Sequence, residues 1–280
     1  MHAAARLKRA VRARIEHRPA RPREAADDPG VIATAGRPPG SARASSFFDA
    51  FPRFYETSET SPYAGRLNLR YEAIFGENRD VFAGARVLDV ASHDGRWSLA
   101  ALETGAARVV GIEPRPELVR AARENLALYS RDEGEYEFVQ GDVFQVLAER
   151  SLEVDVVLCL GFLYHTLRYG ELMHRIRETN ARHLLLDTQV LRRRKGPVVR
   201  LRLESDERQG NVVGDVHGFR GRTLIGWPSR SALELIVESH GFAVERYSDW
   251  GSLVRDNPGA AGVEDYAAGR RVTARCVATD

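Results

Sequence analysis

Three acidic residues stand at matching points of three apolar, strand-like runs: Asp89 in 86–90, Glu113 at the end of 108–113, and Asp142 just after 137–140. The carboxyl ends of parallel strands meet at one edge of a sheet, where open α/β folds bind ligands. A carboxylate at the second point can accept both hydroxyls of a ribose, and one at the third can accept from an exocyclic amine. This spacing favours a site for a ligand that contains a nucleoside.

The turn after the first run is made of small and polar residues and leads into a predicted helix that begins at Arg96. Such a strand-to-helix turn presents free backbone N–H groups, and a small residue there lets a ligand come close. A nicotinamide-binding domain has a similar plan. Its Gly-x-Gly-x-x-Gly pattern is absent, however, because Ala91, His93 and Arg96 stand at those positions.

The surrounding chain alternates strand-like and helix-like segments, which predicts a parallel sheet covered on both faces. Strands are expected at 86–90, 108–113, 137–140, 154–160, 183–190, 198–203, 243–248 and 271–277, and helices at 96–103, 116–130, 143–150, 169–177 and 229–239. We expect a basic, disordered tail over 1–45, a helical aromatic cap over 46–82, and a ligand-binding domain over 83–280. A substrate-side insertion, which includes the glycine-rich stretch 210–226, is expected at about 191–228.

Over residues 66–280 the chain resembles the class I S-adenosylmethionine-dependent methyltransferases. In that family the first motif reads Asp/Glu-x-Gly-x-Gly-x-Gly, and Asp89, Ala91, His93 and Gly95 occupy its positions, so two of the three glycines are replaced. Glu113 matches the ribose-binding acid of the family and Asp142 the adenine-binding acid. The resemblance implies a Rossmann-like, seven-stranded α/β sheet, mostly parallel with an antiparallel last strand, and S-adenosylmethionine as cofactor. The cofactor-binding residues it implies are Asp89, Ala91, Ser92, His93, Gly95, Trp97, Glu113, Asp142, Val143 and Leu160. A relative that has lost the cofactor is the non-catalytic alternative.

Methyl transfer to a hydroxyl requires alignment of the acceptor and a group that removes its proton. His165, which follows the fourth strand, is the first candidate base, and His217 in the glycine-rich stretch is the second. Asp187 ends the fifth strand and is predicted to lie near the same edge. Asp187, Asp215 and His217 together could form a site for Mg²⁺ or Mn²⁺.

The predicted loops near this edge carry aromatic and arginine side chains, which suit a hydroxylated acceptor because aromatic faces stack on sugar rings. The candidate substrate residues are Tyr63, Arg66, Tyr164, Asp215 and Trp227. Arginine accounts for 39 of the 41 basic residues, a composition typical of a high-GC coding background. Together these features resemble the sugar and small-molecule O-methyltransferases of actinobacterial type and predict a saccharide acceptor.

An RNA acceptor is the alternative, because Tyr164-His165-Thr166 resembles the corresponding turn of the tRNA wobble-uridine carboxymethyltransferases. The charge distribution disfavours it: residues 1–45 carry ten basic and four acidic side chains, which leaves 31 basic and 35 acidic side chains in the rest of the chain. Nucleic acid is therefore not the expected partner. No apolar run is long enough to cross a membrane, and Cys159 and Cys276 lie far apart, so we expect a cytoplasmic enzyme. A homodimer is a separate expectation, with a monomer as the alternative.

Overall fold

The computed structural model describes residues 46–57, 62–192, 195–207 and 213–279. The predicted tail at 1–45 lies outside these residues, as does part of the basic run Arg192 to Lys195. Within the described ranges, no helix combines the length and the apolar character needed to cross a membrane.

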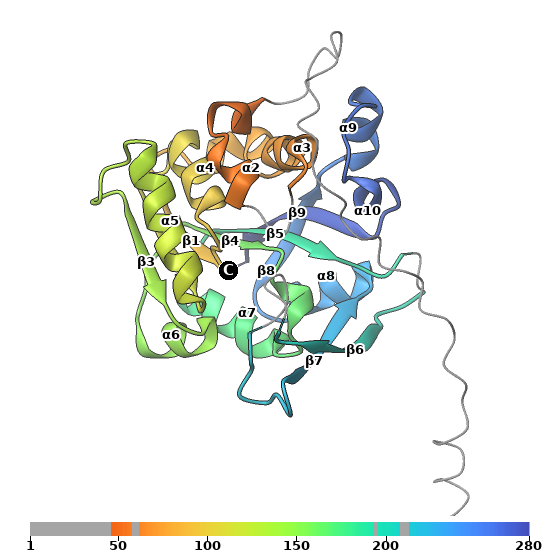
Figure 1. Ribbon diagram of the computed structural model, residues 1–280. Helices are drawn as coiled ribbons and strands as arrows, with labels where there is room; N and C mark the ends of the chain where they lie inside the picture. Colours follow the sequence, from red (N-terminus) through yellow and green to blue (C-terminus); the bar gives the residue numbers. More distant parts are fainter. Residues whose placement is uncertain (1–45, 58–61, 193–194, 208–212, 280) are drawn as a thin grey trace, which may run out of the picture. The chain divides into compact units, whose positions relative to one another are not determined.

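A seven-stranded sheet occupies the centre of the fold (Figure 1) and has the strand order β3-β2-β1-β4-β5-β9-β8. Its strands are β1 (Arg86–Val90), β2 (Arg108–Glu113), β3 (Tyr136–Gln140), β4 (Val156–Leu160), β5 (His183–Gln189), β8 (Phe242–Tyr247) and β9 (Arg271–Ala278). Strands β1 to β5 pair in parallel, and β9 runs antiparallel to both β5 and β8. The predicted Rossmann-like sheet with an antiparallel last strand is confirmed.

Helices cover both faces of the sheet. Neighbouring strand residues point to opposite sides, and the side chains on both sides are apolar, so each face packs against helices. Val87 and Leu158 pack in the cluster that includes residues of α4 (Arg96–Thr104) and α5 (Pro116–Leu128). Leu88 and Val157 pack instead in a second cluster, with residues from the helices α6 (Val143–Glu149), α7 (Tyr169–Glu178) and α8 (Arg230–Glu238). The strands are apolar on both sides, as buried parallel strands are.

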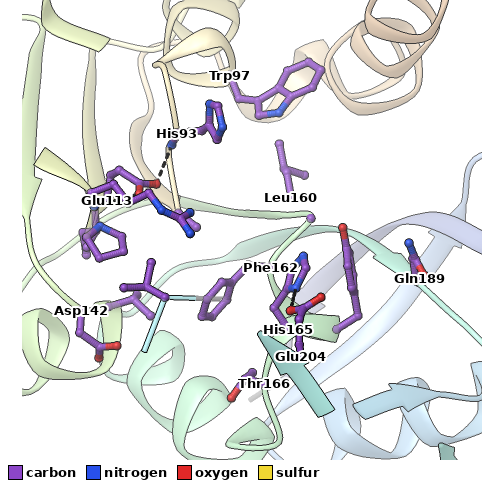
Figure 2. Close-up of a pocket in the computed structure, with 18 of the residues that line it drawn as sticks. His93, Trp97, Glu113, Asp142, Leu160, Phe162, His165, Thr166, Gln189 and Glu204 are labelled. Atoms are coloured by element: carbon purple, nitrogen blue, oxygen red, sulfur yellow. Dashed lines mark hydrogen bonds and ion pairs between the residues drawn. The ribbon is translucent and has the colours of Figure 1, made fainter. Parts of the chain in front are cut away.

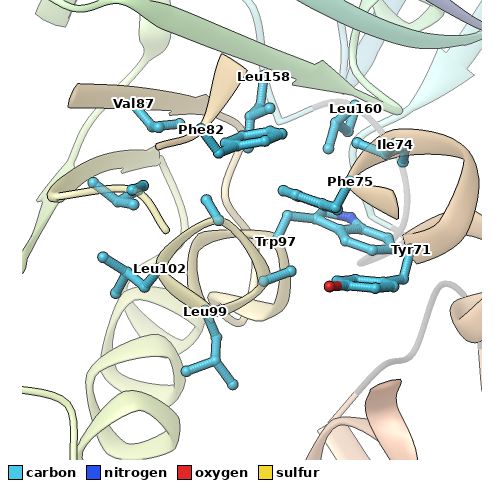
Figure 3. Packing of buried hydrophobic residues seen from close by; sticks show 14 of the residues in the cluster. Tyr71, Ile74, Phe75, Phe82, Val87, Trp97, Leu99, Leu102, Leu158 and Leu160 are labelled. Atoms are coloured by element: carbon cyan, nitrogen blue, oxygen red, sulfur yellow. The ribbon is translucent and has the colours of Figure 1, made fainter. Parts of the chain in front are cut away.

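The aromatic segment before the sheet folds onto the first cluster. It contains the 3₁₀ turns η1 (Phe47–Ala50) and η2 (Gly76–Val81) and the helices α2 (Arg53–Thr57) and α3 (Ala64–Ile74). Phe47 stacks on Tyr71 with ring centroids 3.8 Å apart, and Phe48 meets Trp97 edge to face at 5.5 Å. Figure 3 shows Trp97 of α4 between Tyr71, Phe75 and the sheet residues. The segment thereby packs directly against the helix that follows the first turn.

The C-terminal part contains elements that the sequence did not predict. Strand β6 (Val199–Ser205), which was expected at 198–203, pairs in a separate antiparallel hairpin with β7 (Arg222–Pro228), which was not expected because it begins in the glycine-rich stretch. Gly221, Gly226 and Pro228 are turn signals, but pairing along the whole of β6 overrides them. The turn η3 (Leu163–His165) and the helices α9 (Trp250–Asp256) and α10 (Glu264–Ala267) were also not anticipated.

Replacing Phe48 by Ala is expected to lower the free energy of unfolding by about 3–5 kcal/mol, because the fully buried ring leaves a cavity against Trp97 and Phe54. Urea denaturation followed by tryptophan fluorescence measures the change. Phe219→Ala is the control, since that ring is 72% exposed and its loss should cost less than about 0.5 kcal/mol. Equal destabilisation by the two changes would contradict the buried role of Phe48.

Candidate active site

A cavity of about 470 Å³ opens at the carboxyl edge of the sheet. Of the side chains predicted to form the site, it is lined by Arg66, Ala91, His93, Trp97, Glu113, Asp142, Val143, Leu160, Tyr164, His165, Asp215 and Trp227. Figure 2 shows Glu113 and Asp142 at one end of this pocket and His165, Glu204 and Gln189 at the other. The cavity therefore has an acidic end over β2 and β3 and a second end over β4, β5 and the hairpin.

The turn between β1 and α4 keeps a glycine-like backbone although two of its three glycine positions are occupied by other residues. Ala91, His93 and Gly95 have φ values of 55°, 53° and 80°. This left-handed region costs an ordinary L-residue about 1 kcal/mol or more. A Cβ at Gly95 would lie only 3.0 Å from Leu126 and 3.1 Å from Ala122, so the third glycine is required by packing as well as by φ.

Several hydrogen bonds hold the turn in this conformation. The N–H of His93 donates to Glu113 at 3.1 Å, and His93 Nδ1 lies 2.8 Å from a guanidinium nitrogen of Arg96. Arg96 also donates to Asp94 at 2.6 Å. Burial would raise the pKa of Asp94, but the charge of Arg96, which is the largest opposing cause, outweighs it and holds that pKa at about 2. The ionised Asp94 thus anchors the turn.

The two acids at the ends of β2 and β3 are held by backbone N–H groups. Glu113 is buried at the cavity wall and accepts from the N–H groups of His93 and Arg115 at 3.1 Å each. Burial raises its pKa, and those two N–H groups oppose the rise. Asp142 caps α6 by accepting from the N–H groups of Phe144 and Gln145. Both carboxylates are preorganised to accept hydrogen bonds from a ligand.

Three of the predicted cofactor residues do not line the cavity: Asp89 on β1, and Ser92 and Gly95 in the turn itself. Asp89 accepts from the Ser98 hydroxyl at 2.7 Å and so ties β1 to α4. Ser92 Oγ is fully buried and has no hydrogen-bond partner among the described residues.

His165 contacts a carboxylate that the sequence did not predict as its partner. Its Nδ1 lies 2.6 Å from Glu204 Oε2, and both side chains line the cavity. Because a carboxylate only accepts hydrogen bonds, Nδ1 carries a proton, and Nε2 is the nitrogen that faces away from Glu204 and can take part in proton transfer. The Tyr164 ring packs beside the imidazole with centroids 4.2 Å apart. The pair has the geometry of a base oriented by a carboxylate.

Asp187 lies below the cavity floor and is completely buried. Arg271 contacts its Oδ1 at 2.6 Å and Arg70 at 3.1 Å, while Tyr266 and Thr273 each donate to Oδ2 at 2.7 Å. Burial would raise the pKa of Asp187, but the charges of Arg271 and Arg70 outweigh it and hold the pKa well below its usual range. Asp187 is therefore an anchor for arginines.

His217 and Tyr63 are also placed away from the cavity. His217 is exposed and lines a separate hollow on the hairpin, where its N–H donates to Asp215. Tyr63 is 51% exposed beside Gly262. In the described part of the chain no group of three His, Cys, Asp or Glu side chains could hold a metal ion, so Asp187, Asp215 and His217 do not come together as the suggested metal site.

The cavity also contains side chains that sequence reasoning did not assign to it. They include Arg70, Arg96, Arg115, Phe144, Phe162, Thr166, Gln189, Glu204 and Arg271. Arg70 follows Arg66 by one helical turn, so their i, i+4 spacing was the signal that could have placed both on one face of α3. The other additions depend on contacts between distant segments, for which the sequence carries no local signal.

Comparison with known proteins agrees with this geometry. Residues 87–182 match the family model described as a methyltransferase domain. This segment contains the turn, all the predicted cofactor-binding residues and His165. The chain therefore contains a methyltransferase domain of the class I S-adenosylmethionine-dependent type.

Two solved structures share the fold. An S-adenosylmethionine-dependent methyltransferase from Mesorhizobium loti is 14% identical, with a TM-score of 0.51 over 75% of this chain and 99% of that one. Magnesium protoporphyrin IX methyltransferase from Synechocystis PCC 6803, solved with bound S-adenosylhomocysteine, is 15% identical, with a TM-score of 0.51 over 84% of this chain and 96% of that one. At these identities the likeness shows the fold alone.

Curated relatives match a shorter segment. A ribosomal RNA large subunit methyltransferase I of Serratia proteamaculans is 35% identical over 69 residues, which is 25% of this chain and 17% of that protein. A putative ribosomal RNA large subunit methyltransferase of Methanocaldococcus jannaschii is 36% identical over 66 residues, which is 24% of this chain and 17% of that protein. The match thus spans about a sixth of these relatives' length.

Burial on β1 makes Asp89 a source of pH-dependent stability. Burial raises its pKa from 3.8 to about 7, so the folded state holds this proton over a range in which the unfolded state has lost it. Stability should therefore fall as the pH rises from about 4 to about 7, by up to about 1.4 kcal/mol per pH unit. Asp89→Asn should remove this part of the slope in urea denaturation between pH 5 and pH 7.

Asp155→Asn is the matched control for Asp89→Asn. Burial raises the pKa of Asp155, but Arg86 donates hydrogen bonds to it from its backbone and side chain, and the pKa is lowered as a result. Asp155 therefore stays ionised from pH 5 to pH 7. The Asp155 variant should keep the wild-type slope. Parallel profiles for wild type and Asp89→Asn would show that Asp89 is not protonated in the folded protein at neutral pH.

Proposed function

We propose that the chain is an S-adenosylmethionine-dependent O-methyltransferase that acts on a hydroxyl of a small polar acceptor, with a saccharide as the best candidate. The observation that carries this proposal is the pair His165–Glu204, 2.6 Å apart, at the opposite end of the cavity from Glu113. One end of the cavity suits a nucleoside and the other presents a base. Both are needed to methylate a hydroxyl.

The residues at the acidic end fit the cofactor. The left-handed backbone at Ala91 and His93 keeps the turn open without glycine, and His93 Nε2 is a buried polar atom at the cavity wall with no partner among the described residues. Glu113 would accept from the ribose hydroxyls, and Asp142 would face the adenine. When bound, S-adenosylmethionine supplies a methyl group on a positively charged sulfur, and the neighbouring solved methyltransferase binds the demethylated product at this fold.

His165 has a defined part in the transfer. Its Nε2 would take the proton of the acceptor hydroxyl, whose oxygen would receive the methyl group that the bound cofactor would supply, with the electron pair of the broken carbon–sulfur bond left on sulfur. Glu204 stabilises the imidazolium that results. No metal ion is needed for this proton balance, because the imidazole receives the proton.

A nucleic-acid acceptor is the second candidate, since the curated relatives that match 66 or 69 residues are named as ribosomal RNA methyltransferases. The match covers 24–25% of this chain and 17% of those proteins, so their acceptor is not carried over to this chain. Residues 46–280 carry four more acidic than basic side chains, which opposes binding to a phosphate backbone.

The proposal also includes a cytoplasmic location and a homodimeric state.

Isothermal titration with S-adenosylhomocysteine tests the cofactor half. We expect micromolar binding to the wild type and at least about tenfold weaker binding to Glu113→Gln, because an amide replaces the charged acceptor of two hydrogen bonds. Glu137→Gln is the control, since that side chain is on the neighbouring strand β3 and pairs with Arg150 outside the cavity. Absence of binding, or equal affinity of Glu113→Gln and wild type, would refute the proposed cofactor site.

Transfer of a labelled methyl group to a panel of sugars and hydroxy acids tests the base. His165→Ala should lower turnover about 10²- to 10⁴-fold and leave the affinity for S-adenosylhomocysteine unchanged. His174→Ala, on the exposed face of α7, serves as the control. A large fall with His217→Ala and none with His165→Ala would move the base to the hairpin hollow.

A further inference from the structure

The floor of the cavity carries more positive than negative charge. Arg66, Arg70 and Arg271 line the cavity, and the carboxylates that pair with them are Asp187 and Asp265. Arg66 forms a two-point pair with Asp265, at 2.6 and 2.9 Å. That pair is complete, so Arg70 and Arg271 share the single charge of Asp187. One positive charge is left over.

The guanidinium groups that share Asp187 are both buried. Arg70 and Arg271 are each 5% exposed. Asp187 cannot take up the remaining donors, because Tyr266 and Thr273 already occupy its second oxygen. A buried charge without a counterion is costly, so a bound anion would compensate it.

Arg70 has donor capacity left. Its Nε is buried and has no hydrogen-bond partner in the described part of the chain, although its Nη2 donates to Asp187 and its guanidinium packs over the Trp97 ring at 4.7 Å. Tyr164 and Gly161 flank Arg271 on the cavity side. Each guanidinium is a planar set of donors held in place by these contacts, and such groups recognise carboxylates.

We propose that Arg70 and Arg271 bind a carboxylate group of the acceptor, so that the substrate is an acidic hydroxylated molecule such as a sugar acid or a hydroxy acid. This inference rests on the proposed function. A carboxylate carries one negative charge, which matches the surplus, whereas a phosphate monoester carries nearly two.

The location of the pair favours the acceptor over the cofactor as the source of the carboxylate. Asp187 on β5 pairs with Leu160 on β4, and β5 lies three strands from Glu113 on β2. Three strand spacings are about 14 Å. The pair is on the same side as His165, whose neighbour Tyr164 accepts a hydrogen bond from Arg271. An acceptor held there by its carboxylate can present a hydroxyl to His165.

Matched acid and neutral compounds test the inference. Glucuronate and glucose, lactate and 1,2-propanediol, and 4-hydroxybenzoate and 4-hydroxybenzyl alcohol are titrated calorimetrically at constant ionic strength, with and without S-adenosylhomocysteine. We expect at least one acid to bind the wild type about tenfold or more tightly than its neutral partner. Arg70→Gln should abolish that ratio, and Arg70→Lys should keep part of it. Arg275→Gln is the control. Arg275 lies on the same strand as Arg271, β9, but pairs with Asp80 outside the cavity.

Each alternative has its own signature. If Arg70→Gln weakens S-adenosylhomocysteine but not 5′-methylthioadenosine, which lacks the amino-acid part, the carboxylate belongs to the cofactor and the inference is wrong. If no acid is preferred by the wild type, or the preference survives in Arg70→Gln, the cluster is only structural. If S-adenosylhomocysteine does not bind the wild type, the proposed function fails, while the acid preference can still be measured without it.

Discussion

A single buried carboxylate joins the parts of the chain that enclose the cavity. Asp187 on β5 receives Arg70 from α3, Tyr266 from α10, and Arg271 and Thr273 from β9. An ionised group at 0% exposure is stable only because these donors replace water. Each of these elements contributes a donor to the same carboxylate, so the aromatic N-terminal segment and the last strand are held against the sheet by the same interaction.

The turn after β1 shows that a backbone conformation can persist when the residues that usually provide it are absent. Ala91 and His93 adopt left-handed φ values, and the hydrogen bonds of His93 to Glu113 and Arg96 offset the strain. A glycine pattern is an indirect sign of such a turn. The acids Glu113 and Asp142, which depend only on strand ends, are a more direct sign.

The sheet could be predicted from the sequence because its strands are short apolar runs that end in polar residues, and this pattern is local. The acidic end of the cavity, with Glu113 and Asp142, followed from the same runs. Arg70 could not be assigned, since its partner Asp187 is 117 residues away, and Glu204 could not, since it meets His165 across 39 residues. Strand β7 was missed because its glycines and proline indicate a loop, and only pairing with β6 makes it a strand.

The two ends of the cavity come from different stretches of the chain. Residues 89–160 supply the acidic end and lie within the segment that matches the methyltransferase family. Arg66, Arg70, Glu204 and Arg271 lie outside that segment and reach the cavity from an N-terminal helix, a hairpin and the last strand. Because each of these elements docks on the sheet edge without forming the cofactor turn, mutations in them can accumulate separately. Substitutions in these elements can therefore change which acceptor is preferred without altering the residues of the acidic end.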